Sequence, residues 1–274
     1  MSNYSFLVAS DMDYTLLMPG REISPANLKA AKALQDKGGA LTLATGRTSY
    51  LTGSYARALD IKIPLITSNG AALFDPLAFK DIYSLDFSES TLKTLLTLFL
   101  ENNANATGYS SEGIFFLPES SRREFIADYN NTVTDDIKAL TGEITKEVFE
   151  SKSYPSFNKF LLVAPSEELL GEVKKLPGIQ IVTSAKDFYD VMPVGPSKGD
   201  ALLKLADYLD IPRENVFALG DSENDISMLE AAGHGIAMKG SDPEVLKVAE
   251  YVSDTCEEDG FAKAIYDFIL PLFP

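Results

Sequence analysis

Two aspartates spaced one residue apart, Asp11 and Asp13, are the first side chains in the sequence that could carry out chemistry. They directly follow the run 6–10, whose apolar and small residues are typical of a buried parallel strand. Both carboxylates are therefore expected at the carboxyl end of a strand, the edge where open α/β sheets bind ligands. Because two close carboxylates repel each other, the pair indicates a divalent metal, a nucleophile beside an acid/base, or both.

Further polar residues follow other expected strands or begin an expected helix. A second strand-like run ends at 45, a later one ends at 219, and a helix is expected to begin near 198. Since the carboxyl ends of parallel strands meet at one edge of a sheet, these residues should converge on the first pair. They are Thr45, Gly46, Arg47, Lys198, Asp221, Asn224 and Asp225.

The carboxylates of this set indicate a site for a hard cation. Asp221 and Asp225 are four residues apart where a loop enters a helix, so both can face the same side. Three or four carboxylates without histidine or cysteine partners favour an ion that binds oxygen, and Mg²⁺ prefers carboxylates together with substrate oxygens. We therefore expect Mg²⁺ as the cofactor.

The remaining residues of the set suit the non-bridging oxygens of a phosphate. Thr45 offers a hydroxyl, Gly46 a backbone N–H, and Lys198 an ammonium group. The helix dipole disfavours a cation in the first turn, so a binding role for Lys198 is favoured over a solvated one. Arg47 is compatible with substrate binding and equally with pairing to a carboxylate.

Alternating strand-like runs and amphipathic helices at both ends of the chain predict the elements that position these residues. The pattern predicts an α/β fold, a doubly wound Rossmann-like core with a parallel sheet. The alternation is interrupted in the middle of the chain, which indicates an inserted α+β domain of about a hundred residues. The predicted core is 1–83 with 190–274, and the predicted insert is 84–189.

Composition excludes several classes of partner. The 274 residues carry a formal net charge of −16, which disfavours nucleic acids and anionic membranes as partners. The single cysteine, Cys256, allows no disulfide within the chain and fits a reducing compartment. The start at Met1–Tyr4 lacks the basic and apolar regions of a secretion signal. A soluble cytoplasmic protein is therefore expected.

The sequence resembles the haloacid dehalogenase superfamily of phosphatases. Four segments, in order, look like its four motifs: Asp11-Met12-Asp13-Tyr14-Thr15, Thr45-Gly46-Arg47, Lys198-Gly199 and Gly220-Asp221-Ser222-Glu223-Asn224-Asp225. Ser68-Asn69-Gly70-Ala71 and the tail at 254–260 look more specifically like the Cof-type branch, which carries a large α/β cap where the insert lies here.

The resemblance implies a role for each residue. Asp11 would be the nucleophile that forms an aspartyl-phosphate, and Asp13 the general acid and base. Asp11, the backbone carbonyl of Asp13, and Asp221 would hold Mg²⁺, with Asp225 supporting them from behind and holding Lys198. The phosphate would be bound by Thr45, Gly46, Arg47, Lys198 and Asn224.

Two positions depart from the family pattern. Tyr14 stands where a glycine is usual after the second aspartate, and we expect a helical backbone there, which tyrosine tolerates. Lys239-Gly240-Ser241 replaces the usual Gly-Asn-Ala after Met238. The only histidine, His234, is expected at the C-terminal end of a helix.

The expected function is hydrolysis of a small phosphorylated metabolite by a Mg²⁺-dependent phosphatase, with a sugar phosphate as the first candidate substrate. Two alternatives lie within the family: a phosphosugar mutase, and a phosphatase for pyridoxal phosphate or a flavin-type cofactor phosphate. A catalytically silent sensor that binds a phosphometabolite is the alternative from another class.

Overall fold

The computed structural model describes residues 4–18, 20, 22–195 and 197–274, so the predicted absence of a secretion signal concerns a start that lies partly outside it. The chain forms two compact units. Unit 1 contains residues 1–47, 52–82 and 196–274, and unit 2 contains residues 48–51 and 83–195. Among the described residues, no helix is long and apolar enough to cross a membrane.

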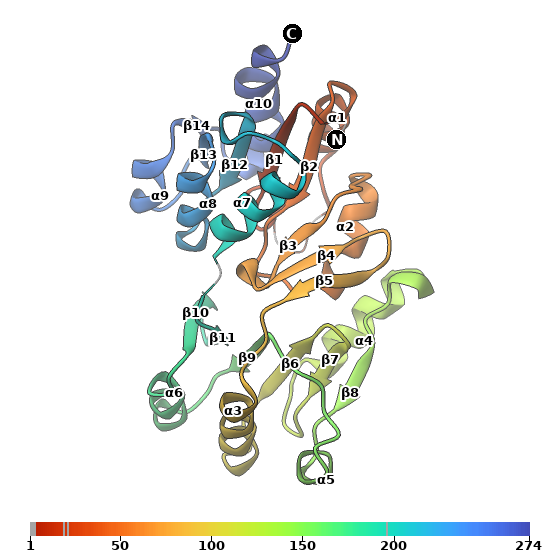
Figure 1. The fold of residues 1–274 in the computed structure, drawn as a ribbon, viewed down its shortest axis with the longest axis vertical. Helices are drawn as coiled ribbons and strands as arrows, with labels where there is room; N and C mark the ends of the chain where they lie inside the picture. The colour runs from red at the N-terminus through yellow and green to blue at the C-terminus, as the bar shows by residue number, and fades with distance from the viewer. Residues whose placement is uncertain (1–3, 19, 21, 196) are drawn as a thin grey trace. The chain divides into compact units, whose positions relative to one another are not determined.

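Unit 1 is built on a parallel sheet whose order is β14-β13-β12-β1-β2 (Figure 1). The strands are β1 (Phe6–Ser10), β2 (Gly39–Leu43), β12 (Val216–Gly220), β13 (His234–Met238) and β14 (Tyr251–Ser253). Every residue of β1, β2 and β12 is buried, as expected for strands covered on both faces. The chain extends the sheet from β1 first to one side and later to the other, so the topological switch point lies at the carboxyl end of β1.

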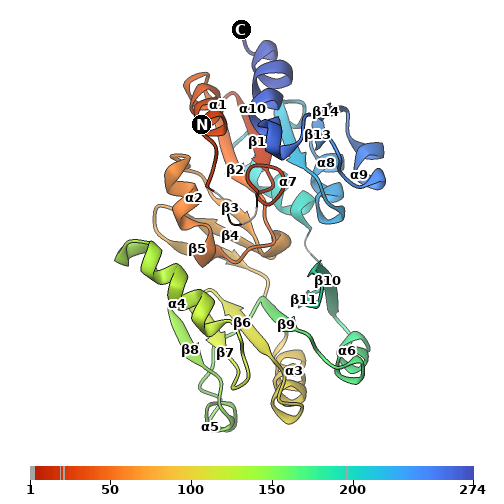
Figure 2. The same cartoon turned by 180° about the vertical axis from the view of Figure 1, so that it is seen from behind.

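Helices cover both faces of this sheet. The helices α1 (Pro25–Asp36) and α10 (Gly260–Ala264) lie on one face, and α7 (Lys198–Tyr208), α8 (Ile226–Ala231) and α9 (Pro243–Val248) lie on the other (Figures 1 and 2). The helix α1 begins directly after Ser24, whose side chain accepts a hydrogen bond from the Asn27 N–H, and Pro25 follows this cap. The doubly wound α/β fold expected from the sequence is therefore present.

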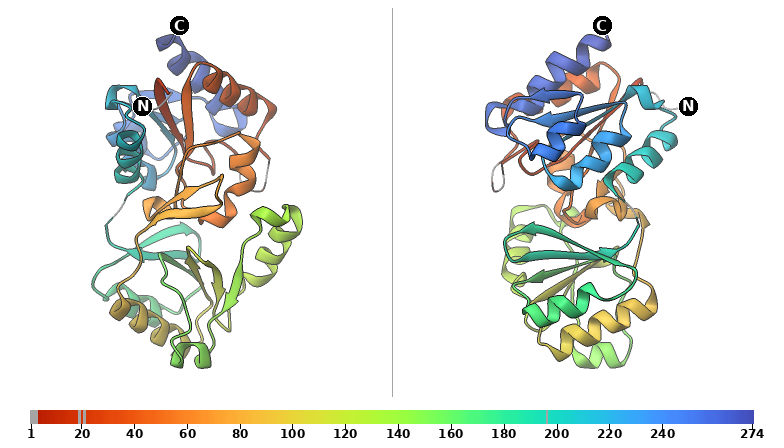
Figure 3. Two further views of the ribbon diagram at one scale, coloured as in Figure 1. Left: turned by 45° about the vertical axis from the view of Figure 1, so that its right-hand side comes forward. Right: turned by 90° about the vertical axis from the view of Figure 1, so that its left-hand side faces the viewer.

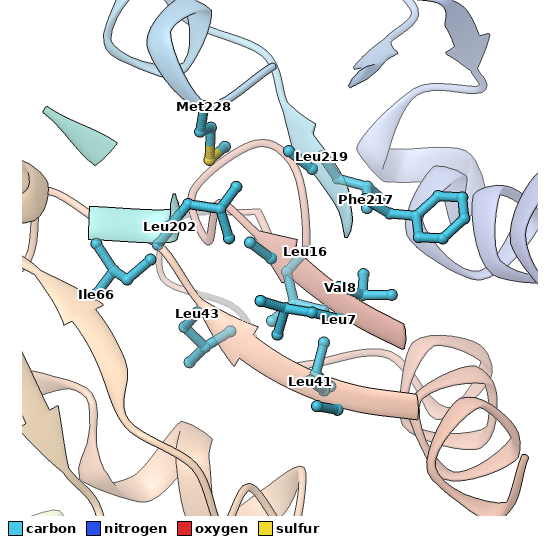
Figure 4. Packing of buried hydrophobic residues seen from close by; sticks show 14 of the residues in the cluster. Leu7, Val8, Leu16, Leu41, Leu43, Ile66, Leu202, Phe217, Leu219 and Met228 are labelled. Carbon is cyan, nitrogen blue, oxygen red and sulfur yellow. The ribbon is translucent and has the colours of Figure 1, made fainter. Parts of the chain in front are cut away.

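The core of unit 1 lies between the central strands and these helices. Leu7 and Val8 of β1, Leu219 of β12 and Leu202 of α7 are fully buried side chains in this cluster (Figure 4). Burial of each such leucine or valine contributes about 1.5–3 kcal/mol relative to exposure. The core holds the strand ends in register and thereby fixes where the polar residues that follow them lie.

The edge beyond β2 continues into a second small sheet. β3 (Leu65–Thr67) makes one parallel bridge to the chain after β2 and pairs antiparallel with β4 (Ala72–Asp75), which is followed by β5 (Lys80–Ser84). Between β2 and β3 lie a 3₁₀ turn at Ser49–Leu51 and the short helix α2 (Gly53–Ala58).

Unit 2 is a six-stranded sheet in the order β10-β11-β9-β6-β7-β8, antiparallel except for β7 and β8. The strands are β6 (Ala106–Ser110), β7 (Gly113–Phe116), β8 (Thr141–Glu143), β9 (Lys159–Val163), β10 (Ile179–Ala185) and β11 (Phe188–Pro193). Its helices are α3 (Glu89–Glu101), α4 (Arg123–Thr132), α5 (Lys146–Glu150) and α6 (Glu167–Lys174). The helices α3 and α6 lie on the same face of the sheet (Figure 3). Apolar side chains of both helices belong to one buried cluster with residues of the sheet.

Two expectations differ from the structure in position. The predicted domain boundary at 189/190 falls inside β11, which pairs with β9 and β10, so unit 2 extends to Gly195. His234 begins β13 and does not end a helix; its ring stacks on Phe217 and its Nδ1 lies 2.7 Å from Glu250 Oε2. Gly233 and Gly235 on either side of it allow backbone atoms of neighbouring segments to pack closely around the strand.

Candidate active site

Lys198 connects two of the predicted carboxylates at the carboxyl ends of β1 and β12. Its Nζ lies 2.6 Å from Asp11 Oδ1 and 2.6 Å from Asp225 Oδ1. The lysine side chain is fully buried, which a charged group tolerates only when it is paired in this way. Asp11 Oδ2 accepts no hydrogen bond from any residue in the described part of the chain, so this oxygen is available to a ligand.

Asp225 is the anchor of the cluster. While Oδ1 accepts from Lys198, Oδ2 accepts from the backbone N–H groups of Asp221 and Ser222, at 2.9 and 3.0 Å. The side chain is completely buried. Because both oxygens are already used, Asp225 fixes the loop after β12 and the lysine.

Asp221 is held by two hydroxyl groups that the sequence analysis did not single out as site residues. Thr15 Oγ1 donates to Asp221 Oδ1 and Ser222 Oγ donates to Oδ2, both at 2.7 Å. Both belong to the quoted motif segments, but the hydroxyl side chain alone gives no sign of its partner. Thr15 is 206 positions away from Asp221, and only the parallel pairing of β1 with β12 brings them together.

Carboxylate oxygens of Asp11, Asp221 and Asp225 lie within 4.8 Å of one another, close enough to hold a metal ion. Burial raises the pKa of Asp11 to about 8 against the attraction of Lys198, and the charge of Asp225 raises it further. Burial also raises the pKa of Asp221. Three carboxylates face one ammonium group, and this excess of negative charge, presented only by oxygen atoms, fits a hard divalent cation such as Mg²⁺.

The first turn of α7 delivers Lys198 to the site. Ser197 caps the helix in a capping box, in which its side chain accepts from the Asp200 N–H and the Asp200 side chain accepts from the Ser197 N–H. Gly70 packs against this turn with φ +93°, and a Cβ on it would lie 2.2 Å from Ser197 O. A glycine is therefore required for this close approach.

Thr45, Gly46 and Asn224 gather around Asn69, which lies after β3. Asn224 Nδ2 donates to Asn69 Oδ1 at 3.0 Å, and Asn69 N–H donates to Thr45 O at 3.0 Å. A Cβ on Gly46 would lie 3.1 Å from Asn69 Oδ1. Asn69 belongs to the segment that resembles the Cof-type branch, and its backbone is left-handed (φ +53°). Its side chain contacts Asn224 and its backbone N–H contacts Thr45, so it links two predicted site residues.

Arg47 forms an ion pair with Asp13. Arg47 Nε lies 2.9 Å from Asp13 Oδ2, and Nη2 lies 2.6 Å from Oδ1. The guanidinium also lies beside the ring of Tyr55, whose centroid is 5.1 Å from Arg47 Cζ. These partners raise the pKa of Arg47 in spite of its burial. Of the two interpretations that the sequence left open for Arg47, this geometry favours the carboxylate partner.

The backbone of Tyr14 differs from the helical conformation expected from the sequence. Its backbone is left-handed, with φ +65°, and not helical. This conformation is fixed by hydrogen bonds from Tyr14 N–H to Leu17 O and from Leu17 N–H to Met12 O. A tyrosine in this region is strained by about 1–2 kcal/mol. Its side chain is 53% exposed, so packing does not explain why a residue other than glycine is present.

A cavity of about 370 Å³ adjoins Asp221. Tyr14 and the segment Lys239–Ser241 both line it, together with Thr255 and Cys256. The two departures from the family pattern thus lie beside the same cavity. Burial raises the pKa of the Cys256 thiol to about 11, so the thiol stays protonated near neutral pH and is a poor nucleophile.

Comparison with known proteins identifies the same family that the four motif segments resemble. Residues 8–265 match the family model described as haloacid dehalogenase-like hydrolase. One relative, a 5-amino-6-(5-phospho-D-ribitylamino)uracil phosphatase of Bacillus subtilis, is 31% identical over 264 residues, which cover 96% of each chain. Another, the pyridoxal phosphate phosphatase of Escherichia coli, is 26% identical over 268 residues, covering 96% of this chain and 98% of that one.

The fold has a match among solved structures as well. A haloacid dehalogenase-like hydrolase from Bacteroides thetaiotaomicron superposes with a TM-score of 0.80 at 27% identity, over 96% of this chain and 98% of that one. Since the likeness spans nearly the whole of both chains, it includes both the sheet that carries the acidic cluster and the inserted unit.

Proposed function

The chain belongs to the haloacid dehalogenase-like hydrolase family, and from this membership and the geometry of its acidic site we propose that it is a Mg²⁺-dependent phosphatase of small phosphorylated metabolites. The observation that carries the proposal is the buried cluster of Asp11, Asp221 and Asp225 around Lys198. A buried excess of carboxylates requires a cation, and a phosphate monoester supplies the oxygen ligands that complete the site of a hard cation.

In this proposal Asp11, Asp221 and the backbone carbonyl of Asp13 hold the metal ion. When bound, Mg²⁺ supplies positive charge that stabilises the transferring phosphoryl group. Lys198 contributes a second positive charge beside Asp11, and its ammonium group is held in place by Asp225. Thr45, Gly46 and Asn224 are proposed to donate hydrogen bonds to the phosphate.

Asp11 is proposed as the nucleophile because one of its oxygens is anchored by Lys198 while Oδ2 accepts no bond within the described chain. Attack by this oxygen on phosphorus would release the leaving group and form an aspartyl-phosphate. Asp13, two residues further along and 34% exposed, is proposed to give its proton to the leaving oxygen and then to take one from the hydrolytic water.

The names of the relatives help to choose among the candidate classes of substrate. The two relatives described above are named for esters of a uracil derivative and of pyridoxal, and these names support the cofactor-phosphate alternative beside a sugar phosphate. The test is release of inorganic phosphate from hexose phosphates, pyridoxal phosphate, flavin mononucleotide and p-nitrophenyl phosphate, with Mg²⁺ or with EDTA. We expect Mg²⁺-dependent turnover of at least one of them.

Other outcomes of that experiment support the alternatives. A phosphosugar mutase would release little phosphate and would isomerise a sugar phosphate only when a sugar bisphosphate is added. A sensor would shift its melting temperature with a phosphometabolite and release no phosphate. Either outcome would contradict the proposed phosphatase.

A further inference from the structure

We propose that Arg47 is a positioning residue that holds the carboxyl group of Asp13 for proton transfer and is not a ligand of the substrate phosphate. The inference rests on the proposed function, because it assigns a role within that reaction. It also replaces the phosphate-binding role that the family resemblance implies for this arginine.

The contact between the two side chains is bidentate. Arg47 Nε and Nη2 each donate to a different oxygen of Asp13, at 2.9 and 2.6 Å. A planar guanidinium that grips both oxygens fixes the plane and the direction of a carboxylate, which a single hydrogen bond does not. The pair is only half-buried, with 24% of the Arg47 side chain and 34% of the Asp13 side chain exposed, so Asp13 remains open to a substrate.

Arg47 is itself held from several sides. Its N–H donates to Thr45 Oγ1 at 3.1 Å, and its carbonyl accepts from the Ser68 N–H at 2.9 Å. At the other end, the aromatic ring of Tyr55 lies beside the guanidinium, with its centroid 5.1 Å from Arg47 Cζ. A side chain fixed at both ends can set the position of its partner.

A different cation, Lys198, lies beside the proposed nucleophile Asp11. Lys198 contacts Asp11 directly, whereas the contacts of Arg47 are to Asp13 and Tyr55. The two cations are therefore divided between the two proposed catalytic carboxylates. This division matches the two tasks in the reaction, which are to stabilise the phosphoryl group at Asp11 and to orient the proton at Asp13.

The role of Asp13 in proton transfer determines which substrates should be affected by loss of Arg47. In the ion pair Asp13 is a carboxylate, so it first takes up a proton from solvent on one oxygen while the guanidinium keeps its hydrogen bond to the other. In the first half-reaction an Asp11 oxygen bonds to phosphorus, the bond from phosphorus to the leaving oxygen breaks, and the proton of Asp13 moves to that oxygen. Asp13 is left as the carboxylate that the guanidinium holds. An alkoxide needs this proton to leave, whereas p-nitrophenolate is stable without it. Loss of Arg47 should therefore affect alkyl esters selectively.

The experiment compares kcat/KM for p-nitrophenyl phosphate with kcat/KM for whichever of glycerol 3-phosphate, glucose 6-phosphate and pyridoxal phosphate the wild type hydrolyses fastest. This parameter reports the first half-reaction when formation of the aspartyl-phosphate is irreversible. The alkyl-to-aryl ratio is kcat/KM for the alkyl phosphate divided by kcat/KM for p-nitrophenyl phosphate. We expect Arg47→Gln and Arg47→Lys to lower this ratio about 30-fold, which is part of the 10²–10⁴-fold rate acceleration that general acid catalysis supplies. Arg57→Gln, which removes an exposed arginine from the nearby helix α2, is the matched control and should leave the ratio unchanged.

A double-mutant cycle separates positioning from phosphate binding. Asp13→Asn should lower the same ratio at least as far, and adding Arg47→Gln to it should change kcat/KM by less than about twofold, because the two residues act as one unit. The inhibition constant of inorganic phosphate should stay within about twofold of the wild type in Arg47→Gln.

The inference is overturned if Arg47→Gln weakens inhibition by phosphate about tenfold or more, adds fully to Asp13→Asn, or lowers both substrates equally. An equal loss accompanied by a lower melting temperature would assign Arg47 a purely structural role, and this also overturns it. If the wild type hydrolyses neither ester with Mg²⁺ present, the proposed function itself fails.

Discussion

At the scale of single residues, Tyr14 is the clearest conflict between side chain and backbone. The left-handed φ of +65° suits glycine, and the tyrosine ring gains little burial in exchange. We expect Tyr14→Gly to raise the free energy of unfolding by about 1 kcal/mol. Tyr14→Ala is the control, because it removes the same ring but keeps a Cβ at this φ. Urea denaturation measures both, and an equal effect of the two variants would contradict backbone strain.

Lys198 illustrates how much a buried ion pair depends on both partners. Removing its ammonium group would leave Asp11 and Asp225 buried without a cation, so Lys198→Met should destabilise the metal-free protein by about 3 kcal/mol. Lys32→Met removes the lysine of an exposed pair with Asp36 on α1 and should cost less than about 1 kcal/mol. Equal losses of stability in urea denaturation would show that the buried pair has no special role.

The raised pKa of Asp11 predicts a pH dependence with a definite sign. Its carboxyl group releases its proton near pH 4 in the unfolded chain but only near pH 8 in the folded one, so the folded state binds more protons between these values. Stability of the metal-free protein should therefore fall as pH rises through this window. Asp11→Asn removes the titration, so its melting temperature relative to the wild type, measured in EDTA, should rise from pH 6 to pH 9. A constant difference would contradict the raised pKa.

At the scale of elements, the site depends on how closely α7 approaches the turn after β3. Gly70→Ala would place a Cβ 2.2 Å from Ser197 O and would force the start of α7, with Lys198, to move. We expect kcat/KM to fall about 100-fold, as for other displacements of a catalytic group by about 1 Å. Gly178→Ala is the control, because this glycine has a similar φ of +75° but no atom within 4 Å of the added Cβ. It should cost about 1 kcal/mol of stability and leave kcat/KM within about twofold. Equal kcat/KM in the two variants would contradict the packing argument.

Sequence patterns predicted the elements better than the contacts between them. The buried strand at 6–10 and the strand that ends near 219 were evident from continuous apolar runs, and the start of α7 near 198 was predicted as well. The conformation of Tyr14 could not be inferred, because it depends on a local network of backbone hydrogen bonds and the side-chain type argues against it. The pairing of Arg47 with Asp13 was left open because a charged side chain can reach several partners, and only coordinates select one.

At the scale of the whole molecule, the net charge of the chain bears on how the site can bind an anionic substrate. The chain has a net charge of −16, yet the proposed substrate is an anion, so binding must rely on local positive charge at short range. Lys198 is already neutralised by two carboxylates, which leaves the metal ion as the main source of that charge. The division into two units leaves the whole acidic cluster in unit 1, so the chemistry depends on that unit.

The central claim is that Asp11 attacks phosphorus in a site that requires a divalent cation. The most direct measurement is Mg²⁺-dependent phosphate release by wild type and Asp11→Asn with the best substrate found. The account predicts turnover that EDTA abolishes and Mg²⁺ restores, and a loss of at least about 10³-fold in Asp11→Asn, which remains folded by circular dichroism. Turnover that survives in Asp11→Asn, or that is indifferent to EDTA, would contradict it.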